Sequence, residues 1–122
     1  MIKVIPELKS LSSPDLGRGQ EPADLSDAAV MVEAGIGPKG KEETEKFSFV
    51  AITPRALSRD HGVRWGRGYL ILDRISWSAV ESAVQQLVSR CAAESWEAVT
   101  NRLSREMHRD FEDDQGKGDT DA

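Results

Sequence analysis

Apolar and polar side chains alternate in two stretches on either side of a glycine-rich segment. Every second residue is apolar over 28–36, and again over 47–51. This is the period of β-strands, whose successive side chains point to opposite faces of a sheet. Only a short polar segment separates the two stretches, so the pattern predicts two paired antiparallel strands. Val50 and Ile52 make the second face of the later strand apolar too, which favours a position inside the sheet.

Two further strands are predicted, one near each end of this pair. The first is Ile2 to Leu11, where Pro6 lacks a ladder donor and therefore favours a sheet edge or a bulge. The second is the short apolar run Tyr69 to Leu72. Between the first strand and the pair, Ser12 to Ser26 is rich in turn formers and acids, which predicts a loop.

Helical signals appear after the paired strands. Thr53 and Pro54 suit a helix start, because threonine can cap free amides and proline fits the first helical position, and His61 with Gly62 suits its end. Ser76 and Ser95 are candidate N-caps of two later helices, and Ser78 with Glu81 offers a competing capping box for the earlier one. The helical apolar period is carried by Val80, Val84, Leu87, Val88 and Cys91 in the earlier helix and by Trp96, Val99, Leu103 and Met107 in the later one.

These elements predict an α+β fold with two parts. Residues 1–110 should form one domain, a small antiparallel sheet of about four strands with two C-terminal helices on one face and a short helix between strands three and four. After Phe111, the only apolar residue of 111–122 is the last one, Ala122, and this composition predicts a disordered acidic tail.

Composition indicates a soluble protein of the cytoplasm. The apolar fraction is 39% and the charged fraction 30%, and no apolar run approaches the length of a membrane span. The first residues lack the pattern of a secretory signal, and the single cysteine cannot form an internal disulfide. We therefore expect no membrane partner and a reducing compartment.

The glycine-rich segment also resembles two nucleotide-binding motifs. Gly35, Gly37 and Gly40 fit G-x-G-x-x-G, and Gly40 with Lys41 nearly completes a P-loop. Both motifs need a helix directly after the loop, because the helix N-terminus binds the phosphate. The alternating residues from Phe47 predict a strand instead. We interpret the segment as a hairpin loop in which Gly37 and Gly40 adopt positive φ.

No other residue set indicates catalysis, a cofactor or a metal. The only two histidines, His61 and His108, have no second ligand at metal-binding spacing, and we place His108 in the last turn of the third helix. Cys91 falls on an apolar helix stripe, which is typical of a core residue. A G-x-S-x-G element is absent from the sequence. We predict a protein that is not an enzyme.

Charge is distributed unevenly along the chain, whose net charge is −5. All nine bases of residues 47–109 are arginines, and acids gather before and after that block. The arginine-rich segment 55–69, with Trp65 and Tyr69, resembles a single-strand nucleic-acid surface. The acidic net charge argues against general nucleic-acid binding, so this module stays an alternative and no nucleic acid is expected.

An ordered set of short motifs resembles the immunity protein 8 family, small bacterial proteins encoded beside polymorphic toxins. The matching residues are Ser13-Pro14-Asp15, Gly37-Pro38-Lys39-Gly40, Phe47, Phe49, Thr53-Pro54, Leu57, Gly66-Arg67, Tyr69-Leu70-Ile71, Asp73, Trp96-Glu97, Val99, Leu103-Ser104 and Phe111-Glu112-Asp113. The resemblance implies binding and neutralisation of a cognate toxin domain, delivered by contact-dependent inhibition or a specialised secretion route. It implies no catalysis and no cofactor.

The charge map suggests where such a toxin would bind. Clustered carboxylates can steer a basic partner, and nuclease toxins have basic active-site grooves. Our hypothesis for the toxin-binding residues is therefore the acids of the first loop and of the tail. A non-enzymatic adaptor remains a further alternative. The hypothetical contact residues are Asp15, Glu21, Asp24, Asp27, Glu112, Asp113 and Asp114.

Overall fold

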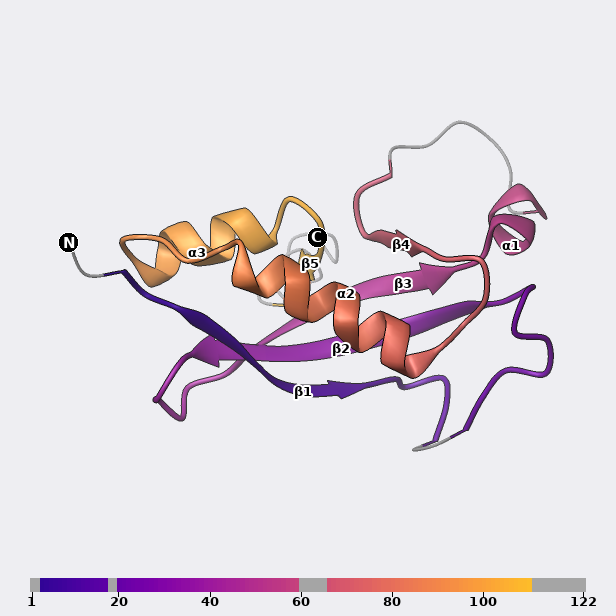
Figure 1. Cartoon of the computed structure of the whole chain (residues 1–122), viewed down its shortest axis with the longest axis horizontal. Helices are drawn as coiled ribbons and strands as arrows, with labels where there is room; N and C mark the ends of the chain where they lie inside the picture. Colours follow the sequence, from indigo (N-terminus) through magenta and orange to yellow (C-terminus); the bar gives the residue numbers. More distant parts are fainter. Residues whose placement is uncertain (1–2, 18–19, 60–65, 111–122) are drawn as a thin grey trace, which may run out of the picture.

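A computed structural model describes residues 3–17, 20–59 and 66–110 of the chain (Figure 1). Strands occupy both halves of this chain, and the two longer helices lie in the C-terminal half. The elements in chain order are β1 (Pro6–Ser12), β2 (Ala29–Pro38), β3 (Glu45–Ile52), α1 (Pro54–Arg59), β4 (Tyr69–Ile71), α2 (Trp77–Ser89), α3 (Trp96–Leu103) and β5 (His108–Arg109).

The predicted strand pair is confirmed as the centre of the sheet. β2 and β3 are antiparallel, with Val32 opposite Phe49 and Ala34 opposite Phe47. These four side chains are buried. β1 continues the sheet on the outer side of β2, and β4 and β5 both pair with β3 on its other side, so β3 lies inside the sheet as predicted.

The α+β class is confirmed, but the prediction of a wholly antiparallel sheet is wrong for β4. That strand runs parallel to β3, with Ala51 opposite Leu70. Residues 53–68 join the two strands and include α1, which gives the chain the length it needs to cross back and enter the sheet in the same direction. The sheet is therefore mixed.

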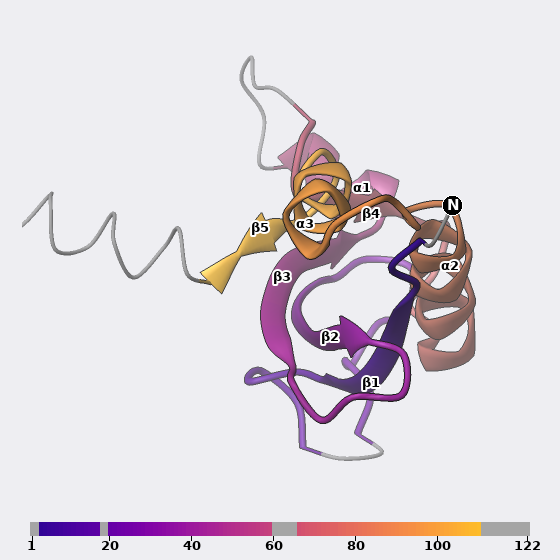
Figure 2. The same ribbon diagram turned by 90° about the vertical axis from the view of Figure 1, so that its left-hand side faces the viewer.

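The two longer helices cover one face of the sheet and close the core. Figure 2 shows β1, β2 and β3 curling around the interior, with α2 and α3 along its open side. α2 contributes Val80, Val84 and Val88 to the core, and α3 contributes Val99 and Leu103. Burial of such side chains is the main favourable term in folding. No helix in the described ranges is long and apolar enough to cross a membrane.

Helix starts follow the predicted caps. The Ser76 hydroxyl accepts a hydrogen bond from the Ala79 amide at 3.3 Å, and the Ser95 hydroxyl accepts one from the Ala98 amide at 3.1 Å. Each bond satisfies an amide that has no partner within its helix. The third helix ends earlier than predicted, at Leu103, and His108 lies in β5 opposite Ser48 rather than in a helical turn.

The first strand has the edge position that Pro6 predicts. β1 begins at Pro6, and its register with β2 shifts between Leu8 and Ser10, which leaves Lys9 in a bulge. An edge strand that carries a proline, a bulge and a lysine is a poor template for pairing with another chain. Before β1, Val4 forms an isolated bridge with Ala93, which brings the N-terminal segment beside the start of α3.

The glycine loop is a hairpin connection, as predicted, but its glycines differ in role. Gly40 has φ of 82°, which favours glycine in the turn. Positive φ at Gly37 was a wrong prediction, because Gly37 is a strand residue opposite Glu7. A Cβ there would overlap the carbonyl oxygen of Glu43, so this glycine allows the two arms of the hairpin to approach.

Replacing Gly37 with alanine should destabilise the fold by about 1–3 kcal/mol, because the added methyl meets rigid backbone. The matched control is Gly66→Ala, where a Cβ meets no atom within 4 Å, and its effect should stay within about 0.5 kcal/mol. Urea unfolding of both variants measures the difference. Equal stabilities would contradict the close approach at Gly37.

Candidate functional site

The acidic loop between β1 and β2 begins with a carboxylate that belongs to the sheet. Asp15 Oδ2 accepts a hydrogen bond from the Met31 amide of β2 at 2.9 Å. Pairing of β1 with β2 ends at Ser12 opposite Glu33, so Met31 lies just beyond the last ladder pair. Asp15 therefore accepts a hydrogen bond from a backbone amide of β2 that lies beyond the end of the pairing with β1. Its first role is to fix the path of the loop.

Asp24 occupies the middle of the same loop and is exposed. Hydrogen bonds from the hydroxyl and the amide of Ser26, at 2.9 and 3.0 Å, hold the pKa of Asp24 below its ordinary value, and the nearby charges of Arg55 and Arg59 act in the same direction. The carboxylate is thus ionised at neutral pH. It carries a fixed negative charge at the surface.

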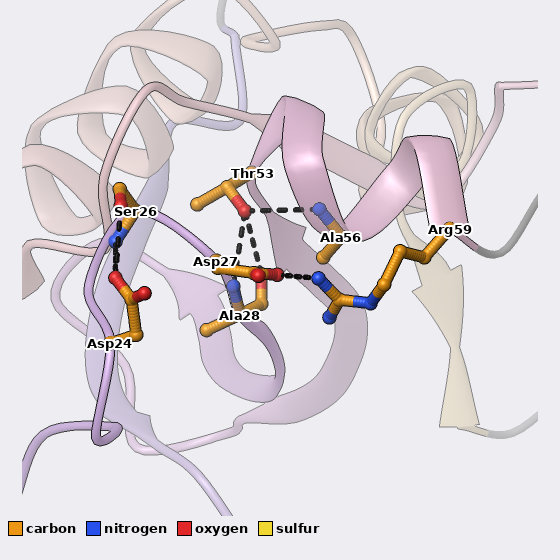
Figure 3. Close-up of polar contacts among 7 residues, drawn as sticks. All are labelled: Asp24, Ser26, Asp27, Ala28, Thr53, Ala56 and Arg59. Carbon is orange, nitrogen blue, oxygen red and sulfur yellow. Dashed lines mark hydrogen bonds and ion pairs between the residues drawn. The ribbon is translucent and has the colours of Figure 1, made fainter.

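Asp27 joins the loop to α1. Its carboxylate forms an ion pair with the guanidinium of Arg59, and Figure 3 shows this pair beside the Asp24–Ser26 turn. Next to it, the Thr53 hydroxyl accepts from the Ala28 amide at 3.0 Å and from the Ala56 amide at 3.4 Å. Thr53 thereby caps α1 and fixes the backbone at Ala28, directly before β2.

The predicted acidic surface is therefore less uniform than the sequence suggested. Asp24 and Asp27 face arginines of α1, whereas Asp15 is bonded to β2. Glu21 is exposed on the loop. Glu112, Asp113 and Asp114 lie outside the described residues, as do the predicted tail and the predicted helix end at His61.

The arginine-rich alternative surface is partly used within the protein. Arg59 pairs with Asp27, and Arg67 donates from Nε to the Ser104 carbonyl at 2.6 Å and from a terminal nitrogen to the Met107 carbonyl at 3.2 Å. Arg67 thus holds the segment before β4 against the turn after α3. Arg59 and Arg67 of segment 55–69 thus stabilise the tertiary structure. Arg64 and Trp65 fall outside the described ranges.

A polar cluster that sequence reasoning missed joins β3, α3 and β5. Glu45 accepts from Trp96 Nε1 at 2.7 Å and from Arg109 at 2.6 and 3.0 Å. Burial favours the neutral acid, but these bonds outweigh it and lower the pKa of Glu45. The three residues are separated widely in the sequence, and no local pattern relates them.

A pocket of 290 Å³ opens between α2, β4 and the turn after α3. Its buried floor is Phe49, Val84 and Met107, and half-buried residues form the walls. Sequence reasoning missed this pocket because its residues come from four parts of the chain. The walls and the exposed rim consist of Tyr69, Leu70, Ala83 and Leu87, then Gln86, Arg90 and Glu106.

Two candidate reactive features, a metal cluster and the Cys91 thiol, can be assessed in the described part of the chain. It holds no group of three or more His, Cys, Asp or Glu side chains that could bind a metal ion. Burial raises the pKa of the Cys91 thiol against the opposing charges of three arginines, so the thiol is protonated at neutral pH. A protonated, buried thiol is a poor nucleophile.

Comparison with known proteins gives a family. The sequence profile described as Immunity protein 8 matches residues 6–114, a range that runs from β1 past β5. The chain belongs to the Immunity protein 8 family. No curated protein and no solved structure shows significant similarity to the chain. The match to Immunity protein 8 confirms the resemblance seen in the ordered motifs, and the family name denotes immunity against a toxin.

Replacing Thr53 with valine should lower the free energy of unfolding by about 1–3 kcal/mol, because the Ala28 amide loses its partner in a partly buried position. Thr53→Ser keeps the hydroxyl and is the control, with a smaller loss. Urea unfolding of the two variants checks this. A valine variant as stable as the serine variant would refute the role of the hydroxyl.

Stability should depend on pH through Glu45. Since the pKa of Glu45 is lowered by folding, its contribution is complete above the ordinary value of 4.5 and is lost as the pH falls through the folded-state pKa. Glu45→Gln should lose stability at neutral pH and show a shallower decline on acidification than the native protein. Unfolding curves from neutral pH to about pH 3 measure this. Glu42→Gln, at an exposed loop position, should keep the native profile; identical profiles for both variants would contradict the prediction.

Proposed function

We propose that this protein binds a cognate toxin domain and neutralises it in the cytoplasm of the producing bacterium, without catalysis. The observation that carries the proposal is the match to Immunity protein 8 over residues 6–114. The described residues support it, because they form a mixed sheet under two helices and hold neither a metal cluster nor a reactive thiol.

A protein that inhibits by binding alone binds more tightly when its contact surface is ordered before binding. Groups held in place before binding lose less freedom when the complex forms. Here Asp15 bonds the described part of the loop between β1 and β2 to β2, Asp27 pairs it with α1, and Asp24 bonds to Ser26 within the loop. Residues 13–17 and 20–28 of the loop thus have internal bonds that do not depend on a partner.

We assign the toxin-contacting surface to this loop and to the acids of the tail. Glu21 and Asp24 are exposed acids that can meet basic groups of the toxin, and Asp15, which is also exposed, and Asp27 hold the loop that carries them. Glu112, Asp113 and Asp114 would extend the negative surface. A toxin with a basic active-site groove, such as a nuclease, is the partner that this charge fits best.

The first test is survival of bacteria that produce the toxin domain encoded beside this gene. Co-expression of the native protein should restore growth, and co-expression of an unrelated acidic protein of similar size should not. Growth arrest despite full expression of the native protein would refute the proposed function.

The second test addresses the charges. Glu21→Gln with Asp24→Asn should slow association with the toxin and weaken its salt dependence, because rim charges act mainly on the association rate. The matched control is Glu42→Gln with Glu43→Gln, which changes two exposed acids in the hairpin loop. It should leave the association rate and its salt dependence unchanged. Stopped-flow binding at several salt concentrations measures the rates. Native association that is indifferent to salt would exclude the acidic surface.

A further inference from the structure

The pocket between α2, β4 and the turn after α3 has the build of a side-chain binding site. Its floor is apolar and buried, and Ala83 and Leu87 of α2 are half-buried in its wall. Its volume of 290 Å³ suits one bulky apolar group. Apolar floors with polar rims are typical of the places where a few anchor side chains supply most of the energy of a protein interface.

The charged residues on the rim of this pocket are one base, Arg90, and one acid, Glu106. Arg105 precedes Glu106 in the turn after α3, and the charges that act on Cys91, next to Arg90, come from Arg90, Arg102 and Arg105 against that single acid. Arg67 adds a fourth guanidinium at the same turn, through its bonds to Ser104 and Met107. The acidic loop described above therefore has a basic counterpart elsewhere on the molecule.

Two of these arginines are available to a partner. Arg102 donates to the Ala92 carbonyl at 2.7 Å, whereas the side chains of Arg90 and Arg105 make no hydrogen bond or ion pair with residues of the described ranges. A guanidinium without an internal partner can form a charge-assisted, bidentate bond with a carboxylate.

We propose that this pocket is a second docking site, which binds a bulky apolar side chain carried on an acidic segment of the partner protein. The apolar group enters between Ala83 and Leu87, and the flanking carboxylates meet Arg90 and Arg105. The inference rests on the proposed function in taking the toxin as that partner. Two patches of opposite sign would fix the orientation of the toxin as well as its affinity.

The pocket can be blocked without changing its surroundings. Ala83→Phe fills it from α2, and Ala79→Phe places the same side chain at an exposed position one turn earlier on the same helix. Ala83→Phe should bind the toxin about tenfold more weakly or worse, and Ala79→Phe should bind as the native protein does. Arg90→Glu should also weaken binding, and Lys39→Glu, an equal charge change on the hairpin loop, should not. Circular dichroism of each variant verifies its fold.

A peptide titration tests the pocket independently of the toxin. The probes are N-acetyl-Asp-Phe-Asp-amide and N-acetyl-Lys-Phe-Lys-amide, followed by the methyl NMR signals of Leu87 and Met107. The acidic peptide should shift both signals at lower concentration than the basic one, and Ala83→Phe should abolish the shifts. Absence of shifts, or equal response to both peptides, would overturn the inference. If the native protein shows the peptide response but does not bind the toxin, the proposed function is refuted, whereas the assignment of the pocket as a side-chain binding site stands.

Discussion

The antiparallel pairing of β2 with β3 is the constraint on which the structure depends. It sets Val32 against Phe49 and Ala34 against Phe47 on one face of the sheet, and that face is the one that α2 and α3 cover. A shift of register by one residue would turn every one of these side chains to the other face. The pairing also forces the chain to reverse between the strands, so the glycine segment cannot begin a helix that binds phosphate.

Hydrogen bonds and ion pairs of charged side chains connect loops, helices and strands outside the apolar core. Asp27 with Arg59 connects the first loop to α1, Arg67 connects the approach to β4 with the end of α3, and Glu45 connects three elements through Trp96 and Arg109. Several of the arginines that make residues 47–109 basic thus serve the fold. Among the charged residues that remain exposed are Glu21, Asp24, Arg90 and Arg105, which we propose as partner contacts.

Much of the fold could be predicted from the sequence, because local patterns determine it. Period-two alternation predicted β2 and β3, and the serine caps predicted the starts of α2 and α3. Pro6 predicted the edge position of β1. The parallel direction of β4 could not be predicted, since three residues carry no sign of their direction. Likewise β5, the Glu45 cluster and the pocket depend on contacts between residues that are distant in sequence. The acids of the candidate site were identified, but their bonds to Met31, Ser26 and Arg59 follow only from tertiary structure.

We propose that this scaffold neutralises its partner by occupying it. An inhibitor that binds is consumed in proportion to the toxin it covers, whereas an enzyme that modifies a toxin acts on many copies. The direct measurement is residual toxin activity against the molar ratio of this protein, followed over time. Neutralisation by binding predicts a linear fall that ends at equimolar protein and does not change with longer incubation. Progressive loss of activity at substoichiometric protein would contradict it.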